Sequence, residues 1–427
     1  MRVLLAVNPH KSVFQYLVPM MWALRTAGHE VRVASQPSFA ETITQAGLTA
    51  VPVGRRRNLD RPLDLLDPSV VAESRRGLPR PWDVAADPSL ADWEYLAEGY
   101  ALATDSLREE NFPLVNDLVE FARQWRPDLV LWDPFTCAGA IAAKAVGAAH
   151  ARLLFGVDVF GVARAEFLRL KEEQPEGERV DPLADWLGSY ARRYGGEFTE
   201  DMVTGHFTVD QFPRSIQLEA PGLHYERMQW VGYGGPAVVP RWLWEKPARP
   251  RVALTMGLSA TDVFNGYTID TSEVLDSLAG LDVEVVATVA AAEQERLGRV
   301  PSNVRMVPYV PMHVLAERCS AVIHHAGAAT LATFARHPVP HLSLHYHFDQ
   351  PVLARKLTEH GAGLDLHTSE VTGPLLRERL VRLLEEPSFA RRAADLRDEL
   401  WALPTPNELV GRLEELTARF RTPALAA

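Results

Sequence analysis

The sequence predicts an α/β protein with two doubly wound parallel sheets that face each other across a cleft. Short apolar runs alternate with amphipathic segments from the first residue onward, which is the pattern of βαβ units. The alternation lapses in a stretch rich in glycine and proline at residues 232–250 and restarts at Val252, as expected of a linker between two domains. The length of 427 residues also suits two large domains.

The first half of the chain contains the elements of one such sheet. Val3–Val7 is predicted to be a buried strand, Val18–Ala27 a helix that ends before Gly28, and Val31–Ala34 the next strand. The following elements are strands at Leu48–Val53, Leu129–Trp132 and Ala151–Leu154, and helices at Ser38–Ala46, Trp93–Trp125, Ala138–Val146 and within Val162–Tyr194. We expect the Trp93–Trp125 helix to break near Pro113, because proline removes a backbone donor and crowds the preceding turn.

The second half repeats this architecture without repeating the sequence. Its predicted strands are Val252–Thr255, Val283–Thr288, Val304–Val307, Ala321–His324, Val339–Leu344 and Gly363–Leu366. We place the domain boundary after residue 235, so that residues 1–235 form the N-terminal domain and residues 236–427 the C-terminal domain.

The amino-acid composition limits the classes of binding partner and the cellular compartment that the protein can have. The net charge is −11, with 55 acidic against 44 basic residues, which argues against a nucleic acid or an anionic membrane as partner. The two cysteines, Cys137 and Cys319, lie far apart in apolar surroundings and are predicted to be free thiols. The Val3–Val7 run is too short for a signal peptide, and the apolar segments fall short of a membrane span. We therefore expect a cytoplasmic protein.

Residues 321–330, Ala-Val-Ile-His-His-Ala-Gly-Ala-Ala-Thr, are the most informative segment. A buried strand delivers two histidines, and small residues then lead into a helix with Thr330 in its first turn. Free backbone amides at such a helix start bind phosphate, and small side chains let the phosphate approach. His325 can add a hydrogen-bond donor or a positive charge for a diphosphate. A turn made of small residues for packing alone is the alternative.

A second segment, Asp349-Gln350-Pro351, follows the next predicted strand at the start of a helix. Asp349 could simply cap that helix, which is a common role for aspartate. The pair also lies at the carboxyl edge of the sheet beside the predicted phosphate site, where open parallel sheets bind their ligands. A carboxylate and an amide side by side suit the vicinal hydroxyls of a sugar.

Together with Val310-Pro311, these two segments resemble the donor half of GT-B glycosyltransferases, in the family that includes plant and antibiotic glycosyltransferases. The resemblance covers nearly the whole chain, and the segments most similar to actinomycete enzymes that attach deoxysugars to polyketides are Met1–Val3, Val18–Val31, Trp125–Leu129, His150–Leu154 and Pro240–Leu243. It implies a GT-B fold in which residues 1–235 bind the acceptor and residues 236–427 bind the nucleotide sugar. The last helix would pack back onto the N-terminal domain.

The resemblance also implies the ligands and partners. The donor would be a thymidine diphosphate (dTDP) sugar and the acceptor a hydrophobic polyketide. Several relatives need a cytochrome-like auxiliary protein docked on the N-terminal domain, and a homodimer is a further expectation. The chain has no Asp-x-Asp motif, so neither a metal nor another cofactor is expected, because backbone amides and a helix dipole can neutralise the diphosphate.

The matching motif positions assign three groups of donor-binding residues: His325, Gly327, Ala329, Thr330, Gly257 and Ser259 for the pyrophosphate; Asp349 and Gln350 for the sugar; Tyr309 and Val310 for the base. The family carries glycine where this chain has Ala326 and Ala329. The approach of the phosphate is therefore expected to differ from that in relatives.

The acceptor side departs further from the family pattern. Relatives carry a catalytic histidine in the loop after the first strand, where this chain has Val13, and valine cannot accept a proton. His10 lies in the same loop and is one candidate base, with a solvated surface histidine as the alternative. Asp133 and Asp158, each after a strand, are further candidates, and each could instead cap a helix or a loop. Some related C-glycosyltransferases also lack the loop histidine, so an oxygen or a carbon linkage is open.

We conclude from the sequence that the protein is an inverting glycosyltransferase acting on a polyketide-type acceptor. The alternative is a catalytically silent GT-B protein that binds the nucleotide sugar without transfer, which Val13 and Ala329 favour and the Asp349-Gln350 pair opposes. A nicotinamide dehydrogenase is a poor third interpretation, because the first strand is not followed by a Gly-x-Gly-x-x-Gly turn.

Overall fold

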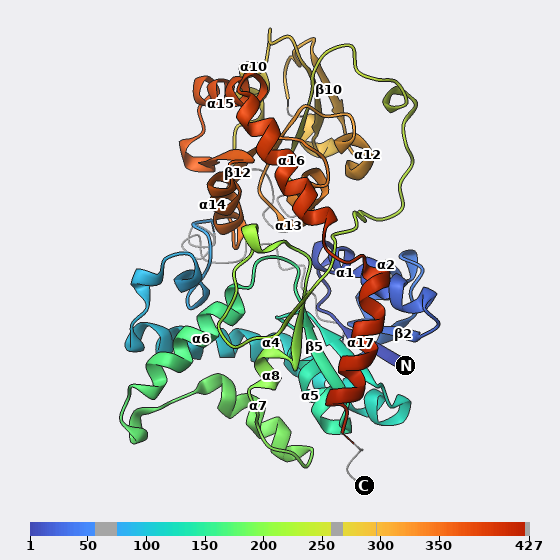
Figure 1. The fold of residues 1–427 in the computed structure, drawn as a ribbon, viewed down its shortest axis with the longest axis vertical. Helices are drawn as coiled ribbons and strands as arrows, with labels where there is room; N and C mark the ends of the chain where they lie inside the picture. The colour runs from blue at the N-terminus through green and yellow to red at the C-terminus, as the bar shows by residue number, and fades with distance from the viewer. Residues whose placement is uncertain (56–74, 258–267, 296, 423–427) are drawn as a thin grey trace.

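The structure is a computed structural model that describes residues 1–55, 75–257, 268–295 and 297–422. It has two lobes, each built on one parallel sheet (Figure 1). The sheet of the N-terminal lobe has the strand order β3-β2-β1-β4-β5-β6-β7, and that of the C-terminal lobe has the order β10-β9-β8-β11-β12-β13. The predicted α/β class with two doubly wound sheets is confirmed.

The elements of the N-terminal lobe are β1 (Arg2–Ala6), α1 (Lys11–Thr26), β2 (Glu30–Ser35), α2 (Ala40–Gln45), β3 (Ala50–Pro52), α4 (Trp93–Trp125), β4 (Leu129–Trp132), α5 (Ala138–Val146), β5 (Ala149–Leu153), α6 (Val159–Glu172), α7 (Pro182–Arg193), α8 (Asp201–Thr204), β6 (Phe207–Asp210) and β7 (Tyr225–Arg227). Strand β1 lies between β2 and β4, with Val3 in register with Val31 and Leu129. Its residues after Arg2 are fully buried, which explains their continuous apolar character.

The C-terminal lobe comprises β8 (Arg251–Thr255), α10 (Thr271–Ser277), β9 (Glu284–Thr288), α11 (Ala291–Gln294), β10 (Val304–Val307), α12 (Met312–Ala316), β11 (Ala321–His324), α13 (Ala328–Ala335), β12 (His341–His345), α14 (Gln350–His360), β13 (Gly363–His367), α15 (Gly373–Glu385), α16 (Pro387–Trp401) and α17 (Pro406–Phe420). Apolar residues of α13 and α14, among them Leu331 and Leu353, belong to the same buried cluster as the sheet of the N-terminal lobe. These helices therefore join the core of the N-terminal lobe, while the C-terminal sheet packs in two separate clusters of its own.

The chain returns to the N-terminal lobe at its end, where α17 packs on α1 and β5 (Figure 1). Arg412 of α17 donates to Glu226 at 2.8 Å, and the ring of Phe420 stacks on His206. A second tie between the lobes is the bond from Trp230 Nε1 to Thr333 Oγ1 of α13, at 3.1 Å. None of the helices in the described part of the chain has the length and apolar character needed to cross a bilayer.

Helix α4 corrects one prediction, since it runs unbroken through Pro113. Its buried face includes Leu107, Leu114 and Leu118, and it packs along α5. The Asn111 side chain donates to the carbonyl of Phe135 and accepts from the amide of Ala138, which ties α4 to the loop between β4 and α5. These tertiary contacts outweigh the single backbone bond that proline removes.

Each sheet has a topological switch point, where neighbouring strands leave in opposite directions. In the N-terminal lobe it lies between β1 and β4, and in the C-terminal lobe between β8 and β11. Open parallel sheets bind their ligands beyond the carboxyl ends of such strands. The loops at these ends contain His10 and Asp133 in one lobe and Gly257 and His325 in the other.

Candidate active site between the two sheets

The predicted phosphate site lies at the start of α13. Gly327 is the N-cap residue of this helix and has extended backbone geometry (φ −63°, ψ 135°). Gly327, Ala329 and Thr330 are partly exposed, so the first amides of the helix are within reach of a ligand. Free amides and the positive end of the helix dipole are the elements of an anion site, so the geometry is compatible with the predicted phosphate site.

The ring of His325 lies beside these amides, between two glycines. A Cβ built on Gly257 would come within 2.4 Å of the ring, and one built on Gly327 would lie 2.2 Å from Nε2. Only glycine at both positions leaves room for the imidazole. Burial lowers the pKa of His325 to about 4, so the ring is neutral at pH 7 and can offer a hydrogen bond but no positive charge. Ser259 lies outside the described residues.

The loop after β11 and the loop after β12 each contain a non-glycine residue in the left-handed region of backbone space. Ala326 has φ 61° and Phe348 has φ 47°, and the other such residue in the described part of the chain is Arg126, which ends α4. This conformation costs about 1–2 kcal/mol per residue when a Cβ is present. Strain of this kind concentrates at functional sites, where surrounding contacts must hold it.

Asp349 and Gln350 occupy the first turn of α14. The Asp349 carboxylate does not cap the helix; instead it accepts from the backbone N–H of Val157 in the opposite lobe. A Cβ on Gly156 would lie 2.1 Å from its Oδ2 atom, so the two lobes meet closely here. Burial raises the pKa of Asp349 to about 7. Gln350 Oε1 accepts from the amides of Tyr346 and His347, both at 3.2 Å, and so shapes its own loop.

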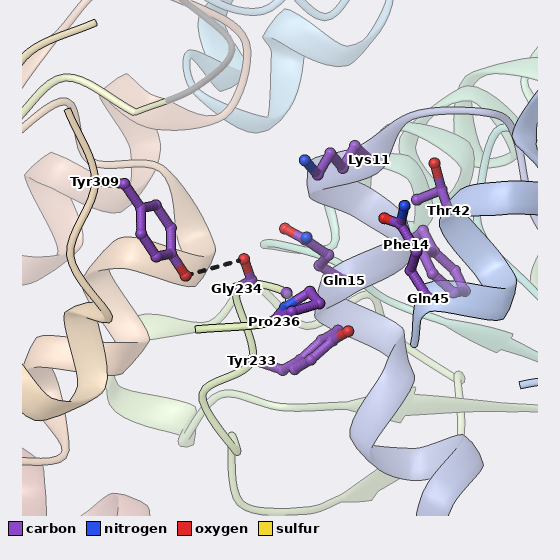
Figure 2. A pocket seen from close by; sticks show the side chains of 10 residues that line it. Lys11, Phe14, Gln15, Thr42, Gln45, Tyr233, Gly234, Pro236 and Tyr309 are labelled. Atoms are coloured by element: carbon purple, nitrogen blue, oxygen red, sulfur yellow. Dashed lines mark hydrogen bonds between the residues drawn. The ribbon is translucent and has the colours of Figure 1, made fainter. Parts of the chain in front are cut away.

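The residues predicted near the base divide into one buried and one exposed side chain. Val310 packs in a small apolar cluster of the C-terminal lobe, so only its backbone could contact a ligand. Tyr309 is 47% exposed and projects toward the linker, with its hydroxyl 3.5 Å from the Gly234 carbonyl oxygen. Figure 2 shows the pocket beside it, with Lys11 and Gln15 of α1 on the other side.

Asp158, one of the acids predicted on the acceptor side, is fully buried. Its carboxylate accepts a bidentate bond from Arg152, at 2.9 and 2.7 Å, and single bonds from the Gly161 amide at 2.8 Å and the Tyr225 hydroxyl at 2.7 Å. Four donors fill the acceptor positions of a carboxylate. Of the two predicted roles, the structure shows the cap of α6, and no acceptor position remains for a substrate proton.

Asp133 and His10 lie together at the switch point of the N-terminal lobe. Asp133 is buried at the end of β4 and accepts from the amides of Asn8 and Phe135 and from the Thr136 hydroxyl. Burial raises the pKa of Asp133, and His10 opposes this shift. His10 is exposed at the N-terminus of α1. Desolvation by the surrounding protein lowers its pKa, and the negative charge of Asp133 partly offsets this shift. Val13 is partly buried against the core.

Sequence reasoning missed a cluster of five aromatic rings at this edge of the cleft: Trp82, Phe135, Phe155, Phe160 and Phe348. Their centroids lie 5.1–6.3 Å apart, the usual spacing of interacting rings. Phe135 and Phe155 follow β4 and β5, which is a signal that the sequence carried. Phe348 comes from the opposite lobe, one residue before Asp349.

His150, Asp201 and His206 form the one group in the described chain whose ligand atoms lie close enough for a metal ion, within 4.8 Å of one another. His150 Nδ1 accepts from Trp132 Nε1 at 3.4 Å, and His206 Nδ1 accepts from the His150 amide at 3.1 Å. A neutral ring whose Nδ1 accepts carries its proton on Nε2, the atom that would have to bind the metal. Lys144 also lies 3.0 Å from Asp201 Oδ2. The group fits an ion pair better than a divalent cation.

The two parallel sheets, with the free amides of α13 on one lobe and an apolar surface beside polar groups on the other, fit the GT-B class of glycosyltransferases. Two family models match the chain, the N-terminal domain of erythromycin biosynthesis protein CIII-like proteins over residues 22–257 and their C-terminal domain over residues 272–416. The chain therefore belongs to the erythromycin biosynthesis protein CIII-like family.

Individual relatives match over the full length. The chain is 45% identical to 10-deoxymethynolide desosaminyltransferase of Streptomyces venezuelae and 42% identical to TDP-daunosamine transferase DnrS of Streptomyces peucetius, in each case over 99% of both chains. Among solved structures, glycosyltransferase VinC in complex with DTDP is 38% identical and has a TM-score of 0.86, covering 98% of this chain and 100% of that one. The predicted glycosyltransferase is confirmed, and the silent alternative is not favoured.

Proposed function

We propose that the protein transfers a deoxysugar from a dTDP-sugar to a polyketide-type acceptor with inversion at the anomeric carbon. The observation that carries this proposal is the anion site at the start of α13, with His325 between Gly257 and Gly327, set opposite Asp349. The relatives support the ligand classes, because one is named for TDP-daunosamine, another for 10-deoxymethynolide, and the solved one was crystallised with DTDP.

The donor half of the site would act on the leaving group. As the bond from the anomeric carbon to the phosphate oxygen breaks, charge grows on the diphosphate. The amides at the start of α13 and an N–H of the neutral His325 ring would face that charge, and such fixed dipoles would stabilise it. Asp349 and Gln350 would hold the sugar hydroxyls, and Tyr309 and the Val310 backbone would flank the base.

The acceptor half would supply the nucleophile and take its proton. An oxygen or carbon nucleophile attacks the anomeric carbon from the face opposite the diphosphate, forming one bond as the other breaks. We assign the proton to His10, whose lowered pKa leaves the ring neutral at pH 7 and whose partner Asp133 stabilises the imidazolium that forms. The apolar body of the acceptor would lie against the aromatic cluster around Phe135 and Phe348.

Both cysteines are free in the structure, which supports a reducing compartment and hence a cytoplasmic enzyme. The auxiliary protein and the homodimer stay predictions from the resemblance.

Thermal denaturation with added nucleotides tests the proposal. Thymidine diphosphate should stabilise the protein, by about 2.7 kcal/mol at a hundred times its dissociation constant, while uridine, adenine and nicotinamide nucleotides should do so less. His325→Ala should lose this stabilisation and its turnover of a dTDP-sugar. The matched control is His337→Ala, just beyond the other end of α13, which should keep both. Full turnover by the His325 variant would refute the assignment.

A further inference from the structure

Behind the anion site lies a pair of histidines that no step of the transfer uses. His324 ends β11 and His341 begins β12, and both side chains are completely buried. Because Val322 is in register with His341, His324 lies diagonally across from His341 on the same face of the sheet. The distance from His324 Nε2 to His341 Nδ1 is 2.9 Å.

The direction of the hydrogen bonds in this pair follows from one backbone donor. The amide of Ala326 donates to His324 Nδ1 at 2.9 Å, so in the neutral ring the proton is on Nε2. That proton is donated to His341 Nδ1, and the proton of His341 is then on its own Nε2, which is buried without a partner in the described structure. Burial lowers the pKa of both rings, that of His341 to about 3, so both are neutral.

The residue at the start of this chain of bonds is the strained Ala326. Its φ of 61° would suit glycine, but alanine has a Cβ and resists it. Ala326 lies between His325, whose ring enters the anion site, and Gly327, which begins α13. A relaxed Ala326 would turn both the ring and the helix start away from their present positions.

We propose that His324, braced by His341, is a positioning residue that holds Ala326 in the left-handed conformation and thereby sets His325 and the α13 amides in place for the donor diphosphate. The inference rests on the proposed function of the anion site. It assigns a role to the buried histidine pair and accounts for an alanine held in the left-handed conformation. Glycine at 326 should make the bond to His324 dispensable.

A rescue experiment tests this. His324→Phe keeps a ring but removes the acceptor, and should weaken thymidine diphosphate binding by roughly tenfold or more, because the bond that holds Ala326 in its strained conformation is lost. Ala326→Gly alone should change the dissociation constant by less than about threefold, and added to His324→Phe it should restore binding to within about threefold of the parent. Calorimetric titration gives the dissociation constants. In steady-state kinetics the His324→Phe variant should show a raised KM for the donor.

His324→Asn supplies the conservative comparison. The asparagine oxygen can take the place of Nδ1 and accept from Ala326, so this variant should bind nearly as well as the parent even if His324→Phe does not fold. Parental binding by His324→Phe, a double variant no better than His324→Phe, or a His324→Asn variant as weak as His325→Ala would each overturn the inference. Undiminished nucleotide binding by His325→Ala would instead refute the anion site itself.

Discussion

Two acidic residues meet at the junction of the lobes and occupy equivalent places in the chain. Asp158 and Asp349 each follow a parallel strand at the carboxyl edge of its sheet, and each begins a helix. They are also near neighbours in space, because Asp349 accepts from the amide of Val157. Asp158 has four donors, including the Arg152 guanidinium, whereas Asp349 has backbone donors and no cation in the described structure. The difference separates a residue that holds the fold from one that is available to a ligand.

The comparison shows that the partners of a carboxylate decide its role more than its place in the motif does. A buried carboxylate that pairs with a bidentate arginine has a structural role, because removing either partner leaves an unpaired charge inside the protein. When burial raises the pKa of a carboxyl group and some of its acceptor positions stay unfilled, a sugar hydroxyl can bind to it. Substitutions at the two acids should therefore have effects of opposite kind.

The largest expected effect is that of Asp158→Asn. It leaves the Arg152 charge buried without its partner, and should lower the free energy of unfolding by about 3–5 kcal/mol. Urea denaturation measures this. The same change at Asp349 is the matched control and should not destabilise the fold. A stable Asp158→Asn variant without turnover would instead make Asp158 the base and remove the distinction.

Sequence reasoning could not separate these two acids, for a physical reason. The donors to Asp158 come from Arg152 and from Tyr225, which is distant in sequence. The local sequence of a helix cap does not show whether such donors exist. The aromatic cluster was missed for the same reason, because Phe348 joins Phe135 only when the lobes meet. By contrast, the proposed anion site is local in sequence, since residues 321–330 contain both the end of its strand and the start of its helix.

The fold was predictable where apolar periodicity and glycine stops agree, which covers most strands of both sheets. The strands β6 and β7, with the sequences Phe-Thr-Val-Asp and Tyr-Glu-Arg, contain few apolar residues and were not predicted. Pro113 misled the prediction for α4, because the buried face of this helix supplies the missing stability. Helix α1 begins at Lys11, ahead of the predicted start at Val18, and also contains a proline, Pro19. Local rules lose to tertiary packing at such positions.

If Asp158 stabilises the fold, another residue must accept the proton of the acceptor, and we propose His10 for this role. His10→Gln should slow turnover by about a hundredfold or more, within the range of a lost general base. Because the pKa of His10 lies below its ordinary value of 6.5, activity in the parent should be flat near neutrality and fall only as the pH drops below 6.5. That acid limb should vanish in the variant. His224→Gln, elsewhere in the N-terminal lobe, is the control, and an acid limb that survives His10→Gln would exclude His10.

The next effect concerns stability at Asp349 and has the opposite sign to that at Asp158. The folded state holds the Asp349 proton up to about pH 7, whereas the usual pKa is 3.8. The unfolded chain releases that proton first, so the stability that the neutral carboxyl provides is present at low pH and is lost as the pH rises through 7. Asp349→Asn should thus raise the free energy of unfolding at pH 8 by about 2 kcal/mol, and by less at pH 5. Asp105→Asn, on the exposed face of α4, should have no effect at either pH, and an unchanged Asp349→Asn curve would mean that the carboxylate is not desolvated.

The smallest effect tests whether the two loops must meet. A Cβ at residue 156 would overlap Asp349 Oδ2, which is the end of a short side chain and can shift, so Gly156→Ala should cost only about 1 kcal/mol. The displaced carboxylate should weaken the hold on the sugar and raise KM for the dTDP-sugar, while the affinity for thymidine diphosphate stays the same. Adding Asp349→Ala removes the overlap, so the double variant should be no worse than Asp349→Ala alone. If the two changes were instead additive in KM, Gly156 would act independently of Asp349, and the contact between the two loops would not be what sets sugar binding.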